Sequence, residues 1–142
     1  MSRGVVQLGL SLVLVVGASE LRSAPQRLKP PAGITCPRDH LTVYSGRVLH
    51  YRRTPGRIVL RIYTDSDTSE RVELKAPERT SLEDHLRLSG QPFVKEDWEK
   101  IESRPRRLRP NMRASAWVCD DGRPPVIDWH PDEPVDASQK PR

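Results

Sequence analysis

The stretch RIVLRIYTD, residues 57–65, alternates apolar and polar side chains along most of its length. One face of an extended chain would carry Ile58, Leu60 and Ile62. The other face would carry Val59 together with Arg57, Arg61 and Tyr63. This period of two is typical of a strand that buries one face and leaves the other in water. We therefore predict a mainly β fold with this strand inside it.

The segments on either side predict two partner strands. Pro55 and Gly56 occupy positions that a type II turn prefers, so residues 40–53, HLTVYSGRVLHYRR, should form the preceding strand. Gly46 in the middle of that segment predicts a bulge or a sharp bend. After a polar loop, ERVELK at 70–75 alternates again. Together the three strands predict an antiparallel meander with one wet face.

A helical insert is predicted after the meander. Residues 80–83, TSLE, match a capping box, and Leu82 and Leu86 lie one helical turn apart before Gly90. A second short helix is predicted at 95–102, KEDWEKIE, where Trp98 and Ile101 would share one side.

The last predicted element is a hairpin around Asp121-Gly122, a strong signal for a two-residue turn. Pro124 and Pro125 cannot donate to a ladder, so they would push the returning strand to an edge or widen the turn. In this register Trp129 shares a face with Met112, Ala114, Ala116, Val118 and Ile127 and should help fill the core. Trp117 falls on the opposite face, outside the core.

The order strand, strand, strand, helix, strand, strand over residues 40–130 resembles the OB-fold, a five-stranded and partly open barrel. The resemblance rests on this order and on the glycine in the first strand. It implies a small five-stranded OB-like barrel with one or two short helices. An SH3-like barrel or a small α+β domain fits the strands almost as well, and both alternatives stay open.

The two ends of the chain are expected to lie outside this domain. Residues 1–18 have a positive start, an apolar run and a small-residue cleavage pattern, which predict a signal peptide cut after Ala18. The alternatives are an uncleaved anchor or a buried helix, but the apolar run is short for a membrane span. Residues 19–39 predict a flexible leader, and residues 131–142 a disordered tail.

Cys36 and Cys119 are the two cysteines of the chain. Export to a secreted or periplasmic location would favour a disulfide between them. In the chain-entropy model a loop of about 84 residues closed in this way contributes on the order of 4.5 kcal/mol. The alternative is a pair of free buried thiols.

Charge is distributed unevenly along a chain whose formal net charge is +5. Basic residues dominate 27–63, acids dominate 64–103, and the run RPRRLRPNMR at 104–113 holds five arginines and no acid. A basic patch would form if the first and third segments meet in space. Within the third segment, RPRRLRP at 104–110 reads as a loop because of its prolines.

No motif in the sequence predicts catalysis, a metal site or a cofactor. The histidines are scattered, and no nucleophile elbow or phosphate-binding glycine loop is present. Asp128, His130 and Asp132 could face a metal from one side of a strand, but they lie near the end of the fold, where supporting contacts are scarce.

Binding is the better supported expectation. On an OB-like barrel the outer face of the second and third strands holds ligands. We expect Arg57, Arg61 and Tyr63 there, with Trp117 as a stacking surface if it lies near. Guanidinium and aromatic groups together suit an anionic or sugar-like ligand. The plain alternative is a solvated sheet face whose charges pair across strands.

The sequence thus predicts a small exported, non-enzymatic binding or interaction module without cofactor and without a transmembrane span after signal cleavage. Its partner would be an anionic polymer or an envelope protein, and nucleic acid is a less natural partner outside the cell. Two alternatives remain, a small secreted metal-dependent hydrolase or nuclease and a structural accessory domain of the envelope.

Overall fold

The computed structural model describes residues 28–133. The predicted signal peptide at 1–18, the first part of the leader and most of the tail lie outside the described residues. The predicted domain boundaries therefore stay predictions.

The described chain is mainly β, as the sequence predicted. Its strands are β1 (Leu41–Thr54), β2 (Arg57–Thr64), β3 (Ser69–Lys75), β4 (Leu86–Leu88), β5 (Gln91–Pro92), β6 (Glu102–Arg104), β7 (Arg107–Leu108), β8 (Arg113–Cys119) and β9 (Val126–His130). Seven of them form one sheet in the order β3-β2-β1-β8-β9-β4-β5, and β6 pairs with β7 alone. Within the large sheet β4 runs parallel to β9, and the other pairs are antiparallel.

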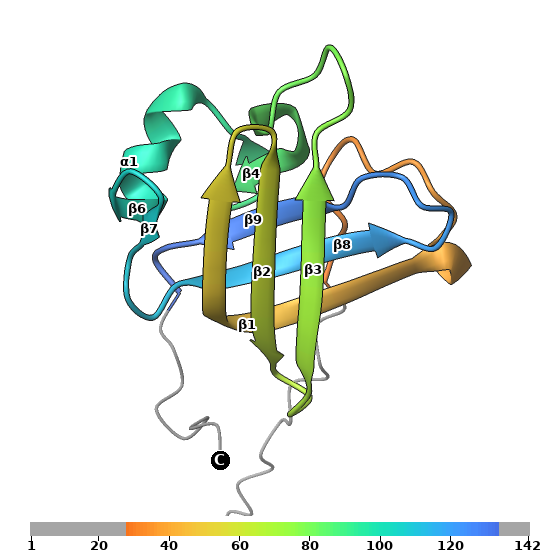
Figure 1. Ribbon diagram of the computed structural model, residues 1–142. Helices are drawn as coiled ribbons and strands as arrows, with labels where there is room; N and C mark the ends of the chain where they lie inside the picture. The colour runs from red at the N-terminus through yellow and green to blue at the C-terminus, as the bar shows by residue number, and fades with distance from the viewer. Residues whose placement is uncertain (1–27, 134–142) are drawn as a thin grey trace, which may run out of the picture.

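β1 belongs to two layers of the folded sheet. Its first half, Leu41 to Arg47, pairs with β8, and its second half, Gly46 to Thr54, pairs with β2. Figure 1 shows the front layer, which contains the second half of β1 with β2 and β3, crossing the back layer, which contains the first half of β1 with β8, β9 and β4. A long strand shared in this way explains how one sheet can enclose a core.

Gly46 stands where β1 has neighbours on both sides, opposite Thr64 of β2 and Ala114 of β8. A Cβ atom built on Gly46 would lie 2.0 Å from the backbone oxygen of Tyr63, so no side chain fits there. The predicted irregularity in this strand is confirmed, but the bulge itself lies three residues later. The register shifts between Val48 and His50, which leaves Leu49 as the extra residue.

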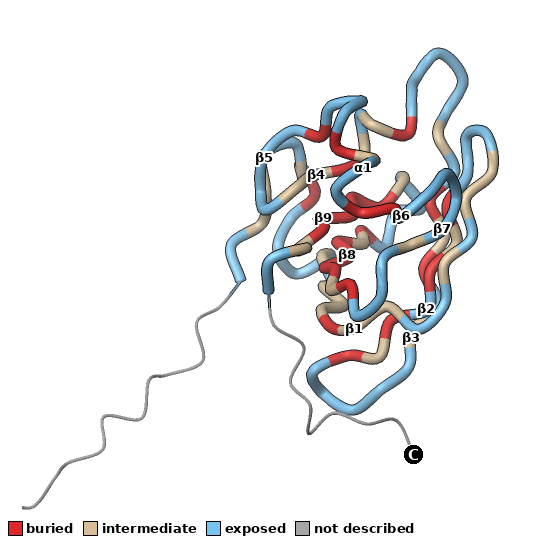
Figure 2. The backbone as a smooth tube through the Cα atoms, turned by 90° about the vertical axis from the view of Figure 1, so that its left-hand side faces the viewer, coloured by how far each residue is buried: buried red, intermediate tan, exposed pale blue. Residues whose placement is uncertain are grey.

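The core lies between the two layers. Ile58, Leu60 and Ile62 of β2 are fully buried, which confirms the face predicted from the alternation. In the back layer Trp129 is fully buried and lies opposite Ala114, in the predicted register. Figure 2 shows this buried band along β8 and β9. The Trp129 ring meets Tyr51 edge to face at 5.9 Å between centroids.

Three details of the predicted architecture need correction. The sheet is not closed, because β3 and β5 are its free edges, so the OB-like barrel is not confirmed and the sheet has seven strands instead of five. The predicted helix at 80–90 is wrong: the chain forms a single 3-10 turn (Glu83–His85) and then β4. Leu86 pairs with Ile127 of β9, and the Gly90 N–H donates to the Asp128 carboxylate, so long-range contacts override the helical spacing.

The third correction concerns the two turns near the end of the chain. The predicted loop at 104–110 contains a small hairpin, β6 to β7, with Arg106 at a positive φ in its turn. The predicted two-residue turn at Asp121-Gly122 is wider, because Trp117 and Val126 form the last strand pair before it. Pro124 and Pro125 fall inside this wider turn, which fits their inability to donate to a ladder.

The second predicted helix is confirmed. A 3-10 turn (Lys95–Asp97) continues into α1 (Trp98–Ile101), and Ile101 is fully buried. The buried Asp97 carboxylate accepts the Val94 N–H at the start of this segment, as a capping carboxylate does. Phe93 and Trp98 contact edge to face at 5.0 Å between centroids. This short helical segment therefore closes one side of the core.

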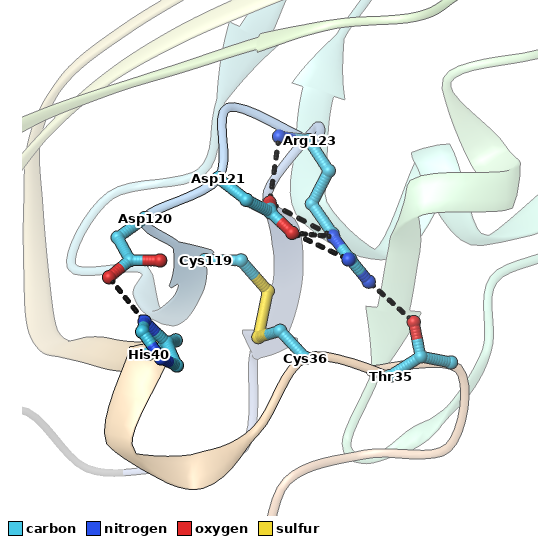
Figure 3. Close-up of a disulfide and its surroundings, with 7 residues drawn as sticks. All are labelled: Thr35, Cys36, His40, Cys119, Asp120, Asp121 and Arg123. Carbon is cyan, nitrogen blue, oxygen red and sulfur yellow. Dashed lines mark hydrogen bonds and ion pairs between the residues drawn. A yellow bond between two sulfur atoms is a disulfide. The ribbon is translucent and has the colours of Figure 1, made fainter.

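The predicted disulfide between Cys36 and Cys119 is present. It ties the segment before a 3-10 turn (Arg38–His40) to the end of β8, as Figure 3 shows. Just before Cys36, Thr35 accepts a hydrogen bond from Arg123 (Figure 3). The Ala32 carbonyl accepts two hydrogen bonds from Arg87. The described part of the expected leader is therefore attached to the outer side of the back layer.

The expectation for Trp117 also needs correction. The residue does lie on the face opposite the core, across from Val126, but it is only 5% exposed. Cys119 and Val126 on the same face are also buried. Trp117 is therefore covered by the chain itself and offers no stacking surface.

Candidate anion-binding face

The outer side of the front layer presents a grid of side chains built by strand register. One row across β1, β2 and β3 is His50, Arg61 and Arg71. The next row is Arg52, Val59 and Glu73, and the third is Thr54, Arg57 and Lys75. The alternation that buries Ile58, Leu60 and Ile62 turns this second set of side chains outward.

A shallow hollow of about 330 Å³ lies over this grid. Its basic lining side chains are His50, Arg52, Arg57, Arg61 and Arg71, and we call these five residues the basic face. Among residues 28–133, no acidic residue lines the hollow. An anion placed in it would meet cationic groups from all three strands.

The acid nearest to this surface is Glu73, which contacts two arginines. Its carboxylate lies 2.9 Å from an Arg57 nitrogen and 3.3 Å from an Arg71 nitrogen. The hydrogen bond from Arg57, followed by the positive charges of both arginines, holds the pKa of Glu73 below its usual value. Glu73 is therefore ionised at neutral pH and offsets part of the charge of these two arginines.

Arg52 and Arg61 have no such partner. Within residues 28–133 neither forms an ion pair with an acidic side chain, and both are exposed. Arg61 also lies directly opposite Arg71, a pairing of like charges that destabilises a sheet. The excess positive charge of the basic face is therefore concentrated on these two residues.

A buried acid stands behind this surface, on the inner side of β1. Glu102 is 5% exposed and accepts two hydrogen bonds from Arg53, each 2.7 Å long, and one from the Tyr51 hydroxyl. The backbone N–H of Arg106 donates to the same carboxylate at 3.0 Å. These contacts fix the β6–β7 hairpin beside the second half of β1.

The ionisation of this cluster follows from its contacts. Burial by itself raises the pKa of Glu102, but the hydrogen bonds from Arg53, Tyr51 and the Arg106 N–H outweigh burial and lower it. Burial raises the pKa of Tyr51, and the neighbouring Glu102 carboxylate raises it further. Arg53 also stacks over the Trp98 ring at 4.2 Å. Glu102 and Arg53 are thus a satisfied internal ion pair that leaves the surface arginines uncompensated.

The predicted binding residues are only partly brought together. Arg57 and Arg61 belong to the basic face, and Tyr63 lies one row beyond them, opposite Arg47. The Tyr63 hydroxyl donates to Asp67 at 3.1 Å. Trp117 lies on the covered face of the back layer, away from this group.

Sequence reasoning missed His50 and Arg52 as members of the surface. Their strand was predicted, but the bulge at Leu49 shifts which residues face outward after it. The missed signal is the alternation His50, Arg52, Thr54, which restarts one residue out of phase with the first half of the strand.

A second polar cluster crosses β1, β8 and β9 on the covered face. Ser115 Oγ lies 2.7 Å from Ser45 Oγ and 3.2 Å from His130 Nε2, and His130 Nδ1 lies 3.8 Å from a Glu133 oxygen. This order of groups is that of a serine hydrolase, but Ser115 is 4% exposed on a central strand. The cluster therefore serves as a hydrogen-bonded row across the sheet.

Among residues 28–133, no group of three or more His, Cys, Asp or Glu side chains is arranged to hold a metal ion. In the same range no helix has the length and apolar character needed to cross a bilayer. Comparison with known proteins finds no matching protein family, no similar curated protein and no similar solved structure.

Proposed function

We propose that this protein is a small exported, non-enzymatic binding module whose basic face holds an anionic polymer. The observation that carries the proposal is the pair Arg52 and Arg61. Both are exposed, and in the part of the chain that the structure describes neither has an acidic partner and no acid lines their hollow. Their charge repels the neighbouring arginines in the free protein. A bound anion would relieve that repulsion and gain charge-assisted hydrogen bonds from the guanidinium groups.

Export is supported by two independent features. The sequence predicts a signal peptide, and the disulfide between Cys36 and Cys119 is of the kind that persists in oxidising compartments. A secreted or periplasmic location places the basic face among the anionic polymers of cell surfaces and matrices. We therefore look for the ligand among these polymers.

The test is elution from immobilised heparin, a sulfated polysaccharide, in a salt gradient. Wild-type protein should be retained and should elute with rising salt, because added ions compete for the same cations. The double variant Arg52→Gln/Arg61→Gln should elute earlier and bind about thirtyfold more weakly, on the basis of about 1 kcal/mol for each cation near an anionic surface.

The matched control is Arg38→Gln/Lys95→Gln, which removes two exposed positive charges that do not line this hollow. It should elute close to wild type. Equal losses in both double variants would mean that net charge alone governs retention, and failure of the wild type to bind would remove the proposal.

A further inference from the structure

A second hollow adjoins the first around the bulge of β1. It has a volume of about 260 Å³, and its lining includes Leu49, His50, Arg106, Arg107 and Arg109. His50 lines both hollows. The two basic segments that lie far apart in the sequence therefore meet at this histidine.

The position of the second hollow follows from the way β1 changes partners. Pairing with β8 ends at Arg47, and the Val48 N–H donates instead to the Met112 carbonyl, at 2.9 Å. Beyond this point the edge of β1 faces the β6–β7 hairpin, which Glu102 anchors to Tyr51 and Arg53. The anchor keeps the exposed hairpin arginines in a fixed place next to the basic face.

The bulge also places an apolar side chain at this junction. Leu49, the extra residue of β1, is 41% exposed and lies between positions that line the two hollows. It offers a contact for an uncharged part of a ligand that passes from one hollow to the other.

Building on the proposed function, we infer that the two hollows form one continuous track for a linear acidic polysaccharide long enough to reach both. The basic face would hold one group of sulfates or carboxylates, and Arg106, Arg107 and Arg109 would hold the next. A polysaccharide that reaches both hollows should bind more tightly than a fragment that reaches one. Once its first part is bound, binding of the second part is intramolecular.

The lining of the track favours a polysaccharide over a nucleic acid. Proteins that hold single-stranded nucleic acids combine cations with aromatic rings on which bases stack. Of the described residues that line the two hollows, Tyr51 is the one Phe, Tyr or Trp, and its hydroxyl donates to Glu102. The track therefore offers guanidinium groups and the apolar Leu49 side chain to a ligand, but no free aromatic ring on which a base could stack.

The experiment measures the affinity of heparin fragments of increasing length, from a tetrasaccharide to the full polymer, at constant salt. Wild-type affinity should rise with length until a fragment spans both hollows. The hairpin variant Arg106→Gln/Arg107→Gln should bind the full polymer about thirtyfold more weakly. Its affinity should stop rising at a shorter length, and its salt dependence should be shallower. Glutamine keeps the backbone strain at Arg106 unchanged, and thermal unfolding verifies the fold.

The outcomes separate this inference from the proposed function. A hairpin variant that matches wild type at every length, beside a basic-face variant that loses binding, overturns the track and leaves the proposed function standing. No binding of wild type to heparin overturns both. Tighter binding to single-stranded or duplex DNA than to heparin, at the same salt, overturns the assignment to polysaccharide and leaves an anionic polymer as the ligand class.

Discussion

At the scale of single residues, Glu102 connects stability to the surface charge of the molecule. It keeps Arg53 paired inside the fold and positions the hairpin that carries Arg106. Acids on the surface would cancel the neighbouring arginines, whereas a buried acid does not. Because Glu102 is buried and paired with Arg53, it stabilises the fold without neutralising the surface arginines.

Replacing Glu102 by glutamine should destabilise the protein by about 2–3 kcal/mol at pH 7. Removing one partner of a buried pair usually costs more, but the Arg53 side chain is 21% exposed and can regain some water. Urea unfolding measures the change. Glu99→Gln is the control, because this neighbouring acid is exposed and its side chain makes no ion pair with the described residues. Equal stability of the two variants would contradict the anchoring role.

The same residue predicts a pH dependence. The pKa of Glu102 is lower in the folded protein than in the unfolded chain, where a glutamate titrates near pH 4.3, so the unfolded state binds more protons at low pH. This contribution is complete above the unfolded pKa and is lost as pH falls through the folded pKa. Between pH 5 and pH 3 the wild type should therefore lose more stability than Glu102→Gln. Parallel losses would show that other carboxylates dominate.

Gly46 supplies a test of the strand crossing. An alanine there would place its Cβ 2.0 Å from the Tyr63 oxygen, so Gly46→Ala should cost more than about 3 kcal/mol, at or above the usual range for overpacking. Gly90→Ala is the comparison, because Gly90 has a positive φ but nothing within 4 Å of the added atom. Its cost should be about 1–2 kcal/mol, the usual cost of the left-handed conformation for a residue with a Cβ atom. Chemical denaturation would rank the two, and a milder effect at Gly46 would contradict the close approach.

At the scale of elements, local pattern predicted the strands and their faces well. The predicted buried face of β2 and the predicted pairing of Trp129 with Ala114 are both confirmed. Alternation is informative in these strands because each of them buries one side. The sequence pattern gave a wrong prediction where contacts with residues distant in the sequence determine the secondary structure. Leu82 and Leu86 have helical spacing, but Leu86 pairs with β9, and nothing near it in sequence shows that strand. The bulge at Leu49 is likewise set by the change of partner strands, so the sequence did not place His50 and Arg52 on the site.

Trp117 shows the same limit on a single face. Its register was predicted correctly, but the residue is only 5% exposed, although it lies on the face opposite the core. Alternation reports which side of a strand a residue occupies, and it cannot report what covers that side.

Reduction of the disulfide should release the segment that Cys36 ties to the end of β8. Opening a loop with a sequence separation of 83 should lower the free energy of unfolding by about 4.5 kcal/mol in the chain-entropy model. Amide hydrogen exchange in β8 and β9 should accelerate more than in β2 and β3, because the attached segment lies on the back layer. Uniform acceleration, or no change on reduction, would contradict the attachment.

At the scale of the whole molecule, the proposed export to an oxidising compartment predicts the state of the mature chain. Protein recovered from outside the producing cells should begin near Ser19 on N-terminal sequencing. Its two cysteines should resist alkylation until a reductant is added. A mature chain that still carries Met1, or thiols that alkylate freely, would contradict export.

The central claim is that the basic face on β1, β2 and β3 is where an anionic polymer binds. The most direct measurement is an amide NMR titration of the ¹⁵N-labelled protein with a heparin tetrasaccharide. The account predicts salt-sensitive shifts at residues 50–52, 57–61 and 71, with the covered face around Trp117 unchanged. Shifts that leave these strands untouched, or no shifts at any concentration in low salt, would contradict it.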